Sequence, residues 1–130
     1  MSWGFPSNAR KIWALMTDKI AAMQAAVCER FGVDPIPLET MAKLGVSQSV
    51  REGLMPLNGL RHPSAETSGW FIWAGEELSE DPDFFLPLHS EHLVQSRPEL
   101  LPYLALPPGS PFLIAENYED VWFDASLLSI

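Results

Sequence analysis

The sequence predicts an α+β fold, in which a long N-terminal helix and short helices pack on a small, mainly antiparallel sheet. Two observations carry this prediction. Over residues 8–31 the apolar residues recur every three or four positions, as on one face of a helix. Beyond residue 68 they gather instead in short aromatic and β-branched runs between glycines and prolines, which is typical of strands. The 130 residues are enough for one domain, with a helical part over 1–57 and an α+β part over 68–128.

The helix over residues 8–31 is the first predicted element. Ser7 and Asn8 are favourable helix caps, and Gly32 supplies a residue suited to the left-handed conformation that ends many helices. The two prolines of 34–37 prevent the helix from continuing. The apolar face of this helix consists of Ile12, Met16, Ile20, Met23 and Val27.

The segment that follows contains two shorter predicted helices. Residues 38–44 form the first, and Ser47 caps the second, which directs Val50 and Leu54 inward. Residues 58–68 are polar and interrupted by glycine and proline, so we expect a loop that joins the two halves of the chain.

The second half begins with a strand over residues 69–74. Because side chains alternate along a strand, Trp70 and Ile72 share one face, and Phe71 and Trp73 share the other. We expect Trp70 to point into the core, since Ile72 beside it is the residue least suited to contact with water. Trp73 then lies toward the acidic run that begins at residue 76.

Two helices and two further strands complete the expected fold. Residues 88–95 predict a short helix, and Ser96 and Glu99 have the spacing of a capping box at the start of another, with Pro98 in its first turn. After a rigid turn over 107–109, residues 111–115 and 119–123 predict strands joined by an acidic loop over 116–120. The expected sheet therefore consists of the strands 69–74, 111–115 and 119–123.

Charge divides the chain into unequal halves. Seven basic and five acidic residues give residues 1–61 a net charge of +2, whereas one basic and twelve acidic residues give residues 62–130 a net charge of −11. Acidic side chains among exposed aromatic residues indicate docking onto a basic surface, and the alternative is a surface that only maintains solubility. The candidate partner-binding residues are Trp73, Glu76, Glu77, Asp81, Asp83, Glu116, Glu119, Asp120 and Trp122.

Composition excludes several classes of partner and location. No stretch approaches the ~20 apolar residues of a membrane span, and the apolar run at 12–16 is too short for a signal peptide. The acidity argues against nucleic acid or an anionic membrane as the partner. Cys28 is the single cysteine and falls in the helical apolar pattern, so we expect a buried, inert thiol. We therefore expect a cytoplasmic protein.

Catalytic and metal motifs are scarce. His89 and His92 lie three residues apart on a predicted helix, a spacing that puts both rings on one face, where Asp83 or Glu91 would complete a metal site. Two histidines alone are a weak signal, and we expect no bound metal and no cofactor. The sequence contains no nucleophile motif and no phosphate-binding glycine loop, so we expect no enzymatic activity.

Five short motifs in the second half occur in the order of a known family. They are Ser68-Gly69-Trp70-Phe71-Ile72-Trp73-Ala74-Gly75-Glu76, Asp81-Pro82-Asp83-Phe84-Phe85, Pro87-Leu88-His89, Leu106-Pro107-Pro108-Gly109 and Glu119-Asp120-Val121-Trp122. In this order they resemble the immunity protein 33-like family, long catalogued as a domain of unknown function. The resemblance covers 68–128, and residues 1–57 match no pattern that we can name.

The resemblance implies a function rather than a catalytic site. Members of that family are considered immunity proteins of bacterial polymorphic toxin systems, which bind and neutralise a cognate toxin. The resemblance therefore implies a protein partner that is a toxin, and the acidic half suggests that this toxin is basic. Two alternatives stay open: a small-molecule or metal-binding regulatory module that uses His89 and His92, and a structural adaptor that docks through residues 1–57.

Overall fold

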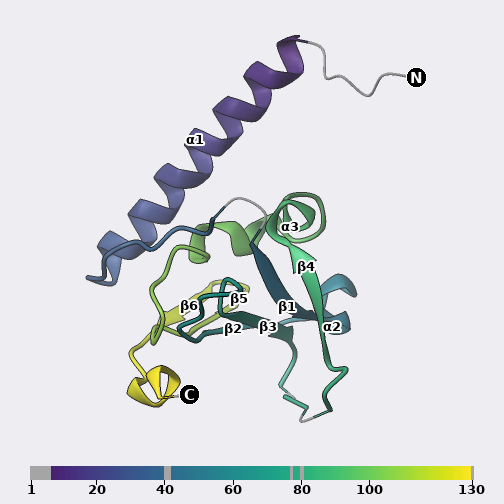
Figure 1. Cartoon of the computed structure of the whole chain (residues 1–130), viewed down its shortest axis with the longest axis vertical. Coiled ribbons are helices and arrows are strands. Elements are labelled where there is room, and N and C mark those ends of the chain that lie inside the picture. Colours follow the sequence, from purple (N-terminus) through teal and green to yellow (C-terminus); the bar gives the residue numbers. More distant parts are fainter. Residues whose placement is uncertain (1–6, 40–41, 77, 80, 130) are drawn as a thin grey trace.

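The fold is α+β, as predicted, in this computed structural model, which describes residues 7–39, 42–76, 78–79 and 81–129. The elements follow in the order α1 (Ser7–Arg30), β1 (Lys43–Ser47), α2 (Gln48–Arg51), β2 (Leu57–Arg61), β3 (Trp70–Ala74), β4 (Phe85–His89), α3 (Ser90–Ser96), η1 (Pro98–Tyr103), β5 (Phe112–Ala115), β6 (Tyr118–Val121) and η2 (Ala125–Leu128), where η marks a 3₁₀ helix. The strands form one sheet in the order β4-β1-β3-β2-β5-β6 (Figure 1). Only the pairing of β1 with β3 is parallel among these described strands.

The long helix α1 confirms the first prediction to within a residue at each end. Gly32 follows it with a φ of +70°, in the left-handed region expected of a helix stop. Of its apolar face, Val27 is buried in the core and Ile20 packs against it. None of the helices in the described part of the chain is long and apolar enough to cross a membrane.

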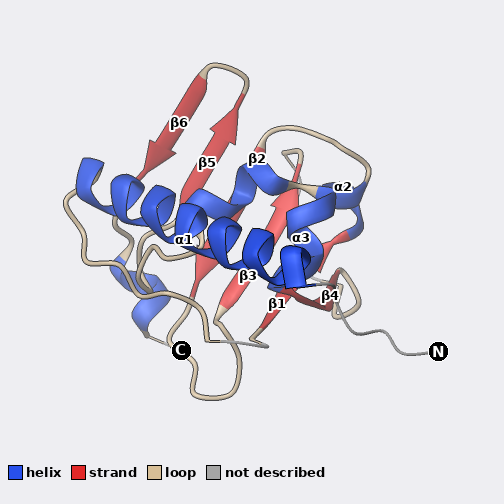
Figure 2. Cartoon of the chain, turned by 90° about the horizontal axis from the view of Figure 1, so that it is seen from above, coloured by secondary structure: helices blue, strands red, loops and turns tan. Residues whose placement is uncertain are grey.

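Helices cover one face of the sheet. Trp70 on β3 donates a hydrogen bond from Nε1 to the carbonyl of Leu104 just after η1, with a distance of 3.0 Å. On β5, Phe112 stacks against Tyr103 of η1 with 5.1 Å between the ring centroids. Figure 2 shows α1 and α3 on this same side of the sheet. The core therefore lies between the sheet and η1, and α1 packs on η1 from outside.

The prediction that Trp70 points inward and Trp73 does not is confirmed. Trp70 is 1% exposed and Ile72 is fully buried, whereas Trp73 on the other side of β3 is only partly buried. Gly59 on β2 makes room for this core, because a Cβ at that position would lie 2.2 Å from a carbon of the Phe112 ring. The predicted strand 111–115 is present as β5. The predicted strand 119–123 is present as β6, but it begins at Tyr118 and ends at Val121, so the acidic loop predicted over 116–120 is only a turn at 116 and 117.

Two predictions in the first half were wrong. Residues 38–44 are not a helix: Lys43 and Leu44 begin strand β1, and residues 40 and 41 lie outside the described residues. Residues 58–68 are not all loop, because 58–61 belong to β2. The polar residues that suggested a loop are satisfied inside the sheet: Asn58 Nδ2 donates to the carbonyl of Gly75 at 3.0 Å, and Arg61 donates to three carbonyls.

Three local predictions also need correction. Helix α2 stops at Arg51 and leaves Leu54 exposed, although Ser47 does precede it and Val50 is buried. The helix predicted over 88–95 begins only at Ser90, because 85–89 form strand β4. The capping box is not formed, since Ser96 donates to the carbonyl of His92 and Glu99 accepts from Arg97.

Candidate functional site

Aromatic side chains gather on the sheet face opposite η1, which we call the open face. Phe71 and Trp73 reach it from β3, and Phe85 reaches it from β4. The ring centroids of Phe71 and Phe85 lie 5.2 Å apart, and those of Trp73 and Phe85 lie 6.4 Å apart, both edge to face. Phe71 is 37% exposed. The open face therefore presents a preassembled aromatic cluster to solvent, and the strands β3 and β4 that carry it are labelled in Figure 1.

Strand β1 lies between β3 and β4, and a glycine in it lets the two phenylalanines meet. Gly45 pairs with Phe71 on one side and with Pro87 on the other. A Cβ on Gly45 would lie 2.9 Å from Cδ1 of Phe71 and 3.2 Å from Cβ of Phe85. Any larger residue would push these rings apart, so Gly45 is part of the aromatic cluster even though it carries no side chain.

Acidic residues lie at one end of this cluster. The loop from β3 to β4 carries Glu76, Asp81 and Asp83, all of them exposed; Glu77 lies outside the described residues. Asp81 Oδ1 accepts a hydrogen bond from the backbone N–H of Asp83 at 2.9 Å, which fixes the loop in a turn. Because β3 leads into this loop and Phe85 begins the strand that follows it, these carboxylates border Trp73 and Phe85.

Two arginines near this sheet, Arg61 and Arg97, are buried and form no ion pair with the described acids of this loop. Arg97, the one basic residue of 62–130, is 6% exposed and donates from Nη1 to the carbonyl of Val50 at 2.8 Å. Arg61 is 5% exposed. Within the described residues, neither ion pair that forms includes Glu76, Asp81 or Asp83.

The remaining predicted partner-binding residues lie at the other side of the sheet. Asp120 pairs with Leu113 and shares the open face with it, and Trp122 follows β6 and is exposed. Glu116 is exposed at the β5–β6 turn, where Asn117 has a φ of +62°. Between β3 and β6 lie two strands, which corresponds to roughly 14 Å. The structure therefore separates the predicted residues into two groups.

Glu119 differs from the others, because its carboxylate is bound within the protein. It pairs with the inward-facing Ile114 and accepts hydrogen bonds from Tyr103 and Arg30. Burial alone would raise the pKa of Glu119, but the hydrogen bonds from Tyr103 and Arg30 outweigh this and lower the pKa. Burial, and then the hydrogen bond to Glu119, raises the pKa of Tyr103.

The two histidines do not share a helix. His89 ends β4 and His92 lies in α3, with 6.1 Å between the ring centroids. Across the described residues, no three His, Cys, Asp or Glu side chains come together as a metal site. Cys28 is fully buried, as predicted, and its Sγ lies 3.7 Å from the carbonyl oxygen of Ala105. Burial, and secondarily the charge of Asp34, raises the pKa of this thiol, which makes it a poor nucleophile.

Sequence reasoning missed Phe71 and Phe85 as members of the site. Alternation along residues 69–74 already placed Phe71 beside Trp73. Phe85 had no such signal, because Pro87 in the same segment argued against a strand. The segment is a strand nevertheless, since β4 lies at the edge of the sheet, where prolines are tolerated.

Most of this chain matches the model of a known family. The model of the Imm33-like domain matches residues 23–124, so the chain belongs to the Imm33-like family. The match begins at residue 23, within α1, so the family also covers residues 23–57, for which the motifs gave no resemblance. A search of curated proteins and a search of solved structures each returned no match.

Proposed function

We propose that this Imm33-like protein is a non-enzymatic immunity protein, which neutralises a cognate protein toxin by binding it through the open face. The observation that carries the proposal is the partly exposed cluster of Phe71, Trp73 and Phe85, bordered by the carboxylates of the β3–β4 loop. The family match supports the immunity role. We expect the protein to act in the cytoplasm of the producing cell.

The aromatic cluster has the properties of a binding anchor. Tryptophan and other large aromatic residues near the centre of an interface contribute most of the binding free energy. Edge-to-face contacts among Phe71, Trp73 and Phe85 hold the rings before binding, so little conformational entropy is lost when a partner covers them. The open face is therefore suited to a rigid protein surface.

The charge of the surroundings favours a basic toxin. Glu76, Asp81 and Asp83 are exposed without an ion-pair partner within the described residues. Such a potential accelerates encounter with a positively charged partner and weakens with added salt. Toxins that act on nucleic acids carry basic clefts, so an acidic inhibitor that covers such a cleft would exclude the substrate.

Residues at the far edge extend the proposed surface. An interface of standard size covers about 800 Å² on each partner, which is roughly 30 Å across, whereas β4 and β6 are roughly 24 Å apart. A partner centred on Trp73 would therefore also reach Glu116, Asp120 and Trp122. We assign Glu119 a structural role instead, because its carboxylate binds Tyr103 and Arg30.

Co-expression with the neighbouring toxin gene tests the proposal. We expect the wild-type chain to restore growth of cells that produce the toxin, and Trp73→Ala to lose this protection because about 2 kcal/mol or more of binding is lost. Phe123→Ala is the matched control, since Phe123 is 67% exposed but lies beyond β6 against Gly109. Full protection by a folded Trp73→Ala variant, or failure of the wild type to bind the toxin, would exclude this function for the open face.

A further inference from the structure

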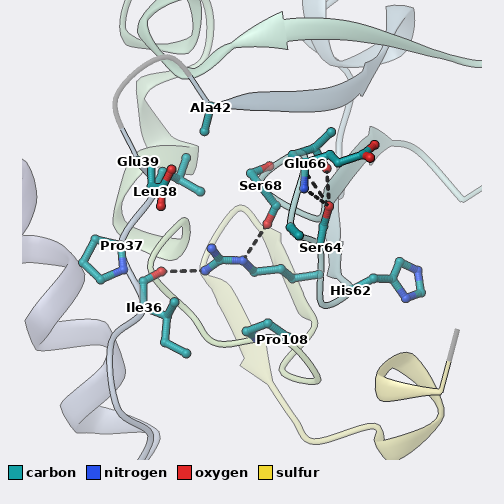
Figure 3. A pocket seen from close by; sticks show the side chains of 13 residues that line it. Ile36, Pro37, Leu38, Glu39, Ala42, His62, Ser64, Glu66, Ser68 and Pro108 are labelled. Atoms are coloured by element: carbon teal, nitrogen blue, oxygen red, sulfur yellow. Dashed lines mark hydrogen bonds between the residues drawn. The ribbon is translucent and has the colours of Figure 1, made fainter.

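A cavity of about 330 Å³ lies at the end of β2, beside a buried arginine. It is bounded by the segment 36–39 on one side and by the loop 64–68 on the other, as Figure 3 shows. Arg61, the last residue of β2, lines it. The volume suits a ligand of a few heavy atoms or the end of a chain, at the lower limit of small-molecule sites.

The guanidinium of Arg61 is held by backbone carbonyls alone. Nε donates to the carbonyl of Ser68 at 2.9 Å, and Nη1 donates to the carbonyls of Ile36 at 2.6 Å and Leu106 at 2.8 Å; Figure 3 draws the bonds to Ile36 and Ser68. These three bonds fix the plane of the guanidinium. Nη2 has no hydrogen-bond partner within the described part of the chain.

The second buried arginine shows what Arg61 lacks. Arg97 is buried to the same degree and also donates to backbone carbonyls, but its Nε donates to a carboxylate oxygen of Glu99 at 2.9 Å. Arg61 forms no ion pair with any described residue. A buried cation without a counter-charge is unfavourable, and burial accordingly lowers the pKa of Arg61. Its remaining contact is with the ring of Trp70, 5.6 Å from Cζ.

We propose that the Arg61 cavity binds the carboxylate of a small zwitterionic group, either a free amino acid or the C-terminal lysine of a peptide. A carboxylate is the planar anion that a guanidinium recognises best. Glu39 and Glu66 are exposed and also line the cavity, so they disfavour a ligand that carries only negative charge. They favour one whose carboxylate is accompanied by an ammonium group. This site is independent of the toxin-binding proposal.

The side-chain N–H signals of the two arginines provide the test. In ¹H–¹⁵N spectra of the wild-type protein, we expect Nε–H of Arg61 to shift saturably on titration with glycine or with Nα-acetyllysine. Nε–H of Arg97 is the internal control, because a carboxylate already binds it, and we expect it to stay in place. A stronger response to glycine identifies a free amino acid as the ligand, and a stronger response to Nα-acetyllysine identifies a peptide C-terminus.

Two further measurements keep the proposal falsifiable without replacing Arg61. Nα-acetyllysine amide has no carboxylate, and we expect it to cause no shift. In the variant Glu39→Gln/Glu66→Gln, both changes are at exposed positions, and we expect zwitterion affinity to fall severalfold because the ammonium loses its counter-charges. Equal shifts with the amide, equal shifts at Arg97, or no saturable shift at Arg61 would overturn the proposal.

Discussion

Arg30 Nη2 lies 2.6 Å from Oε2 of Glu119, so the last turn of α1 is bound directly to strand β6. The hydroxyl of Tyr103, in η1, donates to the same carboxylate oxygen. One carboxylate therefore connects the long helix, the 3₁₀ helix and the sheet. Both charged side chains of the ion pair remain partly exposed, so its own contribution to stability is small and the hydrogen bond from the more buried Tyr103 matters more.

Replacing Glu119 should destabilise the protein in a pH-dependent way. The pKa of Glu119 is lowered in the folded state, so its contribution is present above the unfolded-state pKa of about 4.3 and is lost as pH falls through the folded-state pKa. We expect Glu119→Gln to lower the free energy of unfolding by about 1 kcal/mol at pH 7. The difference from wild type should shrink below about pH 4. Urea midpoints at both pH values measure this, and a difference that stays constant would contradict the assignment.

The two tryptophans of β3 should differ in their effect on stability. Trp70→Ala removes a ring that is 1% exposed, together with the hydrogen bond to Leu104, so we expect a loss of about 3–5 kcal/mol. Trp73→Ala removes a partly exposed ring and should cost less. Denaturant midpoints of the two variants decide the matter. If Trp73→Ala unfolds the protein and Trp70→Ala does not, our assignment of core and open face is wrong.

Alanine substitutions at two glycines should distinguish the cost of backbone strain from the cost of a steric clash. Gly69 has a φ of +84°, and a Cβ there would lie 1.9 Å from the carbonyl oxygen of His62. Gly32 has a similar φ of +70° but no atom within 4 Å of such a Cβ. We expect Gly32→Ala to cost about 1 kcal/mol from strain alone. Gly69→Ala should cost several times more, because the backbone of β3 and of residue 62 must separate. Similar thermal midpoints for the two variants would refute this account.

His92→Ala should leave the protein almost unchanged. His92 is exposed in α3, and substitutions at such positions usually alter stability by less than ~0.5 kcal/mol. We also expect the purified wild-type chain to contain no stoichiometric zinc. Elemental analysis together with thermal unfolding checks both expectations. Zinc at one equivalent that disappears in the variant would favour the metal-binding alternative instead.

Elements with a local signal could be predicted from the sequence, and elements that depend on distant partners could not. The three- and four-residue spacing of Ile20 and Val27 is a local property, so α1 was predicted almost to the residue. Strand β1 contains Gly45, and its two neighbours, β3 and β4, come later in the chain. Only the packing of Phe71 and Phe85 across it explains that glycine, so no local pattern indicated a strand.

The exposed residues of the candidate site could be predicted from the sequence, but the contacts between distant residues could not. Exposed acids such as Asp81 and Asp83 follow from composition and turn chemistry, and alternation predicted that Trp73 faces away from Trp70. Arg30 and Glu119 are 89 positions apart in the sequence, and no local pattern predicts that they pair. The sequence therefore does not distinguish Glu119 from the exposed acids. Arg61 could not be distinguished from a surface arginine either, because its three carbonyl partners come from separate segments.

The rate of association with the neighbouring toxin, followed as a function of salt, tests the central claim most directly. We predict a rate constant that falls steeply between low and physiological ionic strength, where charges are screened over ~8 Å. The variant Glu76→Gln/Asp81→Asn/Asp83→Asn should bind more slowly at low salt and respond less to salt. Binding that is equally fast at all ionic strengths, with the variant indistinguishable from wild type, would contradict an acidic docking surface on the open face.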